Sequence, residues 1–351
     1  MKDAELTLSN SDKLGLMSNF STLLSAGISL LETVDSLLED AKGHQKELLL
    51  RLRADIVQGK RVSDSFSRFP QIFDKVTVSI IRASEEAGTL DRTLKDLKEN
   101  IRKENEFTDK IRTSLIYPLL IVCLFFAVLF VILVFVIPKI STVFESLHVN
   151  LPLPTKILIF LSNLILKYTI PLILSLGVAV LLLYLLYKKK KRFFINLIIS
   201  LPLISDLVKQ IDLTRMTRSL YYLLTSGISI ITALDLAKDV VVREDIAQII
   251  ENSRQMILSG KRLSAGLRTK KGVVPPIMIK IIEAGEKTGS LDKSMQDVSE
   301  YLDYQVNNTL KILITLLEPV MLVVVGIFVG GMMMAIIAPI YGLIGQVGVA
   351  R

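Results

Sequence analysis

The sequence has few of the residues that build metal and redox sites. It contains one cysteine, Cys123, and two histidines, His44 and His148, in 351 residues. One cysteine excludes a disulfide within the chain, and a cluster of thiolate ligands would need several more. The two histidines are far apart in the sequence and have no metal-ligating neighbours. We therefore expect neither a metal site nor a bound cofactor.

Motifs of nucleotide-binding and hydrolytic sites are missing as well. The sequence has no phosphate-binding loop, no glycine-rich dinucleotide fingerprint, no G-x-S-x-G and no H-E-x-x-H. The segments GKR at 59–61 and 260–262 lack the serine or threonine and the upstream glycine of a phosphate-binding loop. Paired acidic residues are common, but solvated helix faces account for them. We therefore predict that the chain is not an enzyme.

Apolar and charged residues occupy separate parts of the sequence. Hydrophobic residues make up 51% of the chain, although 22% of its residues are charged. Three apolar runs, at 114–137, 168–187 and 319–341, contain no charged residue. A bilayer core about 30 Å thick needs a helix of about 20 apolar residues. We predict an all-α integral membrane protein with three transmembrane helices.

Lysine and arginine are distributed unevenly around these runs. Residues 1–112 carry 18 of them and residues 188–311 carry 20, whereas residues 139–167 carry three. Basic residues accumulate on the cytoplasmic side of membrane proteins. We therefore predict that the N-terminus and residues 188–311 are cytoplasmic and that the C-terminus is external. The run KKKKR at 188–192 could also suggest nucleic acid, but beside an apolar run it indicates topology and lipid headgroups, so we expect no nucleic-acid partner.

Three segments of the first half recur about 200 residues later, in the same order. In the third pair, seven of twelve positions are identical, where chance would give about one, so the chain contains a parallel internal duplication. The pairs are LLSAGISLLETVD at 23–35 with LLTSGISIITALD at 223–235, GKRVS at 59–63 with GKRLS at 260–264, and IIRASEEAGTLD at 80–91 with IIEAGEKTGSLD at 281–292.

Each copy is predicted to be a bundle of six helices followed by a span. Apolar residues recur three and four positions apart, as at Leu16, Phe20, Leu23 and Leu24, and alternating strand patterns are almost absent. The second apolar run has no copy and returns the chain across the bilayer. The predicted domains are 1–112 (first cytoplasmic helical domain), 113–138 (first span), 139–167 (short external loop with an interfacial segment), 168–187 (second span), 188–311 (second cytoplasmic helical domain) and 312–351 (third span and external tail).

The repeated glycine motifs predict helix–turn–helix corners. Gly88 and Gly289 suit the left-handed position that ends a helix. Thr89 and Ser290 suit the N-cap of the next helix, where an aspartate in the first turn is favourable. The residues assigned to these corners are Gly27, Gly227, Gly88, Leu90, Asp91, Gly289, Leu291 and Asp292.

Some acidic residues and glycines have no such local explanation. Glu85 and Glu286 precede the corners, and capping does not require them, so they are candidates for contact with a partner. Glu318 lies at the cytoplasmic edge of the third span, where an acidic residue is a functional candidate, although a position in headgroup water explains it equally well. Gly326 and Gly330 form a G-x-x-x-G motif that allows another helix to approach closely.

In combination, these segments resemble a known family over almost the full length of the chain. The chain resembles the GspF/PilC family, the inner-membrane platform proteins of type II secretion systems and type IV pili, which contain a duplicated F domain. Ser84 departs from the family's glycine, which is present as Gly285. The segments that carry the resemblance are LLSAGIS, LLTSGIS, EEAGTLD, GEKTGSLD, LPLPTKIL at 151–158, LPLISDLV at 201–208 and EPVMLVVVGIFVGG at 318–331.

The resemblance implies a non-catalytic platform in the cell inner membrane. Members of the family bind a cytoplasmic hexameric ATPase and help load pilin subunits into a growing filament. The implied partners are that ATPase, a pilin or pseudopilin, other inner-membrane assembly proteins and a second copy of the chain, in a pilus, secretion or competence machine. On this basis, ATPase or self-association contacts are assigned to Glu85, Glu86, Glu283 and Glu286, and membrane packing to Pro118, Glu318, Pro319, Gly326 and Gly330.

Two other functions are weighed against a platform. A small-solute transporter would have more spans and charged residues at mid-membrane, and the three predicted spans have uncharged centres. A membrane signal relay would have a sizeable external sensor, whereas the predicted external loop, 139–167, is short. The platform accounts best for the residues.

Overall fold

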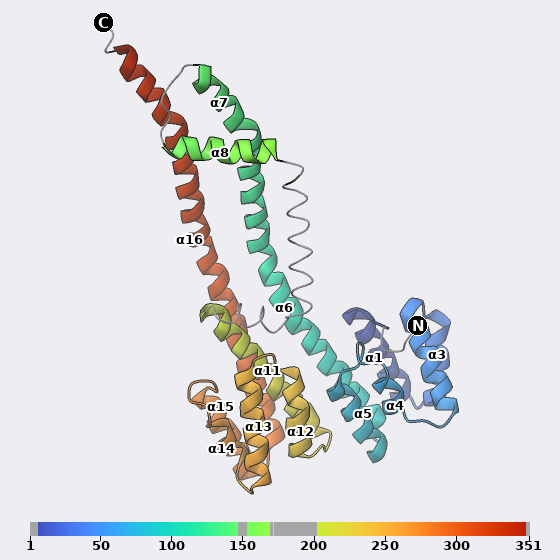
Figure 1. Cartoon of the computed structure of the whole chain (residues 1–351). Coiled ribbons are helices and arrows are strands. Elements are labelled where there is room, and N and C mark those ends of the chain that lie inside the picture. Colours follow the sequence, from blue (N-terminus) through green and yellow to red (C-terminus); the bar gives the residue numbers. More distant parts are fainter. Residues whose placement is uncertain (1–5, 147–152, 169–170, 172–201, 349–351) are drawn as a thin grey trace. The chain divides into compact units, whose positions relative to one another are not determined.

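A computed structural model describes residues 6–146, 153–168, 171 and 202–348. Within these ranges the chain forms helices and turns and no strand, so the predicted all-α class is confirmed. Contacts between residues divide the chain into two units. Unit 1 contains residues 1–110 and 205–308, and unit 2 contains residues 111–204 and 309–351. Most helices of both units are labelled in Figure 1.

Unit 1 contains the two sequence repeats, and helices occur in the same order in both. In the first repeat they are α1 (Asn10–Ser25), α2 (Leu30–Asp40), α3 (Gly43–Val57), α4 (Val62–Ser67), α5 (Lys75–Ala87) and the start of α6 (Leu90–Val131). In the second repeat they are α11 (Pro202–Thr225), α12 (Ile230–Ala237), the 3-10 turn η3 (Lys238–Val240), α13 (Glu244–Leu258), α14 (Leu263–Leu267), α15 (Pro276–Thr288) and the start of α16 (Leu291–Gly348).

Capping residues explain where several of these helices begin. Ser29 forms a capping box with Glu32 at the start of α2, which satisfies two backbone N–H groups that the helix leaves unpaired. Asp74 accepts a hydrogen bond from the backbone N–H of Thr77 at 2.7 Å and starts α5. In the second repeat, the hydroxyl of Ser229 accepts a hydrogen bond from the backbone N–H of Thr232 at 3.3 Å and starts α12. These caps fix the ends of helices that are too short to be stable alone.

Each repeat has its own apolar core. The core of the first repeat is rich in phenylalanine, and the rings of Phe66 and Phe73 stack with their centroids 4.0 Å apart. The core of the second repeat is built mainly from leucine, isoleucine and methionine, for example Leu220, Ile249 and Met278. The duplicated helices therefore enclose cores of different composition.

Helix α5 belongs to both cores. Ile81 lies in the core of the first repeat, whereas Val76 and Ile80 are buried in the core of the second repeat. At the start of the same helix, Lys75 forms an ion pair with Asp239 of the second repeat at 2.7 Å. The apolar contacts join the repeats, because separating them would expose Val76 and Ile80 to water.

Small residues allow close packing of α13 against α14 in the second repeat. A Cβ atom added to Gly266 would overlap the Cα of Ser253. In the first repeat the aligned residues are Ser65 and Leu52. The two repeats therefore fill the same junction with side chains of different size, and only the second requires a glycine there.

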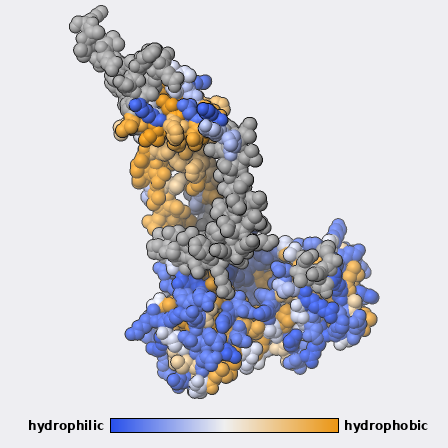
Figure 2. Space-filling view, in the orientation of Figure 1, coloured by the Kyte–Doolittle hydropathy of each residue, from blue (hydrophilic) through white to orange (hydrophobic). Residues whose placement is uncertain are grey.

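Helices that are long and apolar enough to cross a membrane begin in unit 1 and continue into unit 2. Among the described residues, two helical stretches meet this condition, Leu90–Val143 and Leu291–Met334, and almost none of their apolar segments is buried within the protein. Leu124, Phe126, Leu322 and Ile327, for example, are all exposed. Figure 2 shows this apolar surface in orange. Lipid contact accounts for so much exposed apolar surface, so the chain is a membrane protein.

The predicted second span, 168–187, and the basic run at 188–192 lie almost entirely outside the described residues. The other parts of unit 2 are a π-helical segment η2 (Ile132–Val136), α7 (Ile137–Ser146) and α8 (Leu153–Lys167). Ser162 of α8 is buried and donates a hydrogen bond to the carbonyl oxygen of Leu133 at 2.6 Å. A π-helix disturbs the regular backbone hydrogen bonding, and this serine satisfies one of its carbonyl groups while holding α8 against η2.

We predict that Gly266→Ala destabilises the protein by about 2 kcal/mol, because the new Cβ forces α14 away from the backbone of α13. This cost exceeds the gain of about 1 kcal/mol that alanine has over glycine within a helix. The measurement is thermal unfolding of the full chain in detergent, followed by circular dichroism. Gly15→Ala in α1 is the matched control, because nothing lies within 4 Å of its added Cβ. Equal melting temperatures for the two variants would contradict the prediction.

Candidate functional site

The three repeated motif regions meet in the second repeat, where their residues line one open cavity of about 310 Å³. We call this place the second corner, comprising residues 260–264 and 285–292, and the aligned residues 59–63 and 84–91 the first corner. Besides Ile257, the lining residues are Ile230, directly after LLTSGIS, then Lys261, Arg262 and Leu263, and finally Gly285, Glu286, Gly289 and Leu291.

Left-handed glycines form the turns of both corners. Gly88 and Gly289 have φ angles of 68° and 73°, a conformation that costs other residues energy because of their Cβ atom. The N–H of Thr89 then bonds to the carbonyl of Ser84, and the N–H of Ser290 bonds to that of Gly285. This pattern ends one helix and starts the next, which is the geometry predicted for these motifs. Gly27 and Gly227 end α1 and α11 in the same conformation.

Glu85 and Glu286 hold the two halves of each corner together. The carboxylate of Glu85 accepts hydrogen bonds from the backbone N–H groups of Val62 and Ser63, at 2.6 and 3.0 Å. Glu286 accepts from the N–H groups of Leu263 and Ser264 in the same manner. Each glutamate thus caps a short helix, α4 or α14, whose first two residues lie 23 and 22 residues earlier in the chain.

Glu85 and Glu286, which stay predicted contact residues, therefore also have a structural role that the sequence did not reveal. Neither is needed to cap its own helix, but each caps the N-terminus of another, where a negative charge is favoured. The signal was available in the sequence as two motifs that recur together at constant separation. Without a structure, however, nothing indicated that one motif bonds to the other.

Glu86 and Glu283 lie nearer to solvent and form ion pairs. Glu86 pairs with Arg61 at 2.8 Å, and both side chains are more than half exposed. Glu283 pairs with Arg268 at 2.6 Å and with Lys287 at 3.0 Å. Hydrogen bonding to Lys287, followed by the charge of Lys287 and the bond to Arg268, lowers the pKa of Glu283. Exposed ion pairs of this kind contribute little to stability, so these carboxylates can exchange partners readily.

A buried carboxylate, Asp55, lies behind the first corner. It is 4% exposed and accepts hydrogen bonds from Lys60 at 2.8 Å and from Ser65 at 2.9 Å, while Arg68 lies 3.3 Å away. Burial opposes ionisation of Asp55, but these hydrogen bonds and cations together lower its pKa. Lys60, although part of the GKR motif, is thereby paired within the protein.

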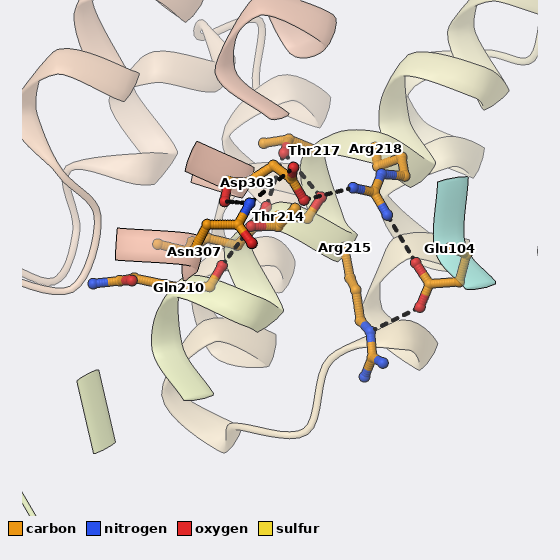
Figure 3. Close-up of polar contacts among 9 residues, drawn as sticks. Glu104, Gln210, Thr214, Arg215, Thr217, Arg218, Asp303 and Asn307 are labelled. Carbon is orange, nitrogen blue, oxygen red and sulfur yellow. Dashed lines mark hydrogen bonds and ion pairs between the residues drawn. The ribbon is translucent and has the colours of Figure 1, made fainter. Parts of the chain in front are cut away.

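Arg218 connects the two repeats within unit 1. Its guanidinium donates to Glu104 of the first repeat at 2.9 Å and to Asp303 of the second repeat at 3.4 Å. Arg215 also donates to Glu104, at 3.2 Å. Figure 3 shows Arg218 between the two carboxylates. The guanidinium also lies over the ring of Phe107, with its carbon 5.0 Å from the ring centre, so this largely buried charge has both ionic and aromatic partners.

Sequence reasoning missed this connection, although the alignment of the repeats contains a trace of it. Glu104 aligns with Gln305, and Arg218 aligns with Ser18. Charges that occur in only one copy are candidates for contacts between the copies. In the same region, burial raises the pKa of Tyr222 to about 12, and the neighbouring Tyr221 adds to this effect. The hydroxyl of Tyr222 therefore stays neutral at physiological pH.

The membrane-packing candidates are accessible where the structure describes them. Glu318, Pro319, Gly326 and Gly330 are exposed, and nothing lies within 4 Å of a Cβ added to either glycine. Pro118 lies within α6 and is half-buried. No partner helix packs against the G-x-x-x-G face in the described part of the chain.

No group of three or more histidine, cysteine, aspartate or glutamate side chains is placed to hold a metal ion within the described residues. The second corner combines the exposed cations Lys261 and Arg262 with a cavity that apolar side chains help to line.

The model of the family described as type II secretion system (T2SS), protein F, matches this chain twice, at residues 16–138 and 216–339. The two matches begin and end at aligned positions of the repeats and together cover most of the sequence.

Curated relatives match over nearly the whole chain. The type IV pilus assembly protein PilC of Thermus thermophilus is 30% identical over 332 residues, which cover 93% of this chain and 81% of the relative. The protein of the same name from Pseudomonas aeruginosa is 27% identical, with 93% and 88% covered. Type II secretion system protein F of Aeromonas hydrophila is 26% identical, with 92% and 84% covered.

We predict that Glu85→Gln and Glu286→Gln each destabilise the protein by about 1 kcal/mol, because the cap loses its charge and one acceptor oxygen. Hydrogen exchange of the full chain should become faster at the starts of α4 and α14 respectively. The control is Glu86→Gln, which changes the neighbouring residue identically but removes only an exposed ion pair. A larger effect for this control than for Glu85→Gln would show that the caps are unimportant.

We predict that Glu104→Gln destabilises the protein by about 2 kcal/mol, because Arg218 keeps a largely buried charge with a weaker partner. This free energy lies between those measured for exposed and for fully buried ion pairs. A double-mutant cycle with Arg218→Met, measured by urea unfolding of the full chain, should give a coupling energy of at least about 1 kcal/mol. Glu106→Gln on the same helix is the control, because Glu106 forms an exposed pair with Arg102. A coupling energy near zero would remove Arg218 as a connection between repeats.

Proposed function

Because the chain belongs to the type II secretion system protein F family, we propose that it is a non-catalytic membrane platform that couples a cytoplasmic hexameric ATPase to the insertion of pilin subunits into a growing filament. The resemblance to the GspF/PilC family is confirmed by the double family match. That match, which extends over most of the chain, is the observation that carries the proposal. Relatives named for type IV pilus assembly and for type II secretion support a role in such a machine.

The proposal includes a topology. Two six-helix domains lie in the cytoplasm, and three spans cross the inner membrane, with the 139–167 segment and the C-terminus outside. The distribution of lysine and arginine supports this orientation. Two apolar helices of sufficient length support a membrane location. A parallel duplication with both copies on one side requires a span between them, for which 168–187 is the apolar run available.

Acidic residues of unit 1 and residues of the third span are the proposed contacts with partner proteins. Glu86 and Glu283 are the better candidates for the ATPase or a second copy, because their carboxylates lie near solvent and form only exposed or half-exposed ion pairs. Glu85 and Glu286 are available to a partner only if it tolerates their capping role. Glu318, Gly326 and Gly330 are proposed to pack against pilin or a second copy, and their exposure supports this.

We expect the full chain, purified with its membrane, to bind the assembly ATPase encoded in the same genome and to hydrolyse no ATP alone. Co-purification of a tagged chain with that ATPase and its pilin is the measurement. The control is an ATPase variant in which the phosphate-binding lysine is changed, which should still bind but support no filament assembly. Solute uptake into liposomes by the chain, without ATPase binding, would favour the transporter alternative and overturn the platform.

A further inference from the structure

The two corners differ in charge although they share a backbone plan. In the first corner, both cations of the GKR motif have acidic partners within the repeat. Lys60 pairs with Asp55 at 2.8 Å, and Arg61 pairs with Glu86 at 2.8 Å. In the second repeat, the residues aligned with these two acids are Met256 and Lys287. Neither of these two residues can form an ion pair with a cation, because Met256 is uncharged and Lys287 is itself a cation.

The cations of the second corner are consequently free. Lys261 and Arg262 are exposed, and neither side chain forms an ion pair or hydrogen bond with another residue in the described part of the chain. The nearby acids do not replace the lost partners. Glu286 accepts the N–H groups of Leu263 and Ser264, and Glu283 is paired with Arg268 and Lys287. Asp292 has an equivalent in the first corner, Asp91, so it does not alter the difference between the corners.

An apolar hollow lies beside these two cations. The cavity of about 310 Å³ is lined by Ile230, Leu263 and Leu291 as well as by Lys261 and Arg262. At Gly289, an added Cβ would meet nothing within 4 Å, which leaves this side of the cavity open. A hollow of this size has room for an aliphatic side chain, and the adjacent cations favour a partner segment of negative charge.

We infer that the second corner is a docking surface for an acidic protein segment that inserts an aliphatic side chain. The carboxylates of the segment pair with Lys261 and Arg262, and its aliphatic side chain covers Leu263 and Leu291. The first corner is not a second copy of this surface, because Asp55 and Glu86 already neutralise its cations. This docking surface rests on the proposed platform function, but its binding to a synthetic peptide can be measured without any other component of the machine.

The test measures binding of two fluorescent peptides to the full chain in phosphatidylcholine nanodiscs by anisotropy. One peptide is acidic with a central leucine, and the other has the same charge with serine in its place. We expect the leucine peptide to bind more tightly and Lys261→Glu with Arg262→Glu to weaken it at least about tenfold. The control, Lys271→Glu with Lys280→Glu, makes the same change in net charge at exposed residues outside the cavity and should change affinity less than about twofold.

A second pair of variants tests the comparison between corners. Met256→Asp with Lys287→Glu gives the second corner the acids of the first and should abolish peptide binding while preserving the fold, as read from the melting temperature. The inference would be overturned if Lys261→Glu with Arg262→Glu weakened binding no more than the control Lys271→Glu with Lys280→Glu. Equal binding of the leucine and serine peptides would also overturn it. Loss of peptide binding when phosphatidylglycerol is added would instead assign the cations to lipid headgroups. A lower oligomeric state of Lys261→Glu with Arg262→Glu would assign them to a second copy.

Discussion

Each repeat depends on one interaction, in which the first N–H groups of a short helix donate hydrogen bonds to a glutamate carboxylate. Helices α4 and α14 have six and five residues, far fewer than an isolated helix needs in water. Glu85 and Glu286 supply the missing acceptors and join two motifs separated by more than twenty residues. The left-handed glycine after each glutamate then turns the chain into the next helix. The bond therefore joins the start of the short helix, directly after GKR, to the glycine turn of the same corner.

The same scaffold has diverged in charge and in size between its two copies. The first repeat buries Asp55 with Lys60 and closes its corner with an ion pair to Arg61. The second repeat instead has small residues at the junction of α13 and α14 and two exposed cations, Lys261 and Arg262, at its surface. Capping geometry constrains the backbone alone, so the side chains around it are free to change. A duplicated fold can therefore keep one plan while its two surfaces meet different partners.

The sequence predicts local features better than contacts across the chain. The helices, their glycine ends and the apolar runs follow from neighbouring residues, and Gly88 and Gly289 have the expected backbone conformation. The role of Glu85 did not follow, because its partners lie 22 and 23 residues away. Arg218 and Glu104 are 114 residues apart, and no periodicity links them. Likewise, Val76 and Ile80 have the spacing of any buried helix face, which says nothing about which core they enter.

The shared helix α5 has a mechanical consequence for a platform. Moving one repeat relative to the other would expose Val76 and Ile80 to water. It would also break the hydrogen bond between the guanidinium of Arg218 and the carboxylate of Glu104. Exposing an aliphatic side chain costs about 1.5–3 kcal/mol, and uncovering a buried charge costs more. These costs oppose small shifts, so the two repeats respond to an applied force together. If a motor binds either repeat, as proposed, both of the long helices α6 and α16 receive the displacement, because each begins within one of the joined repeats.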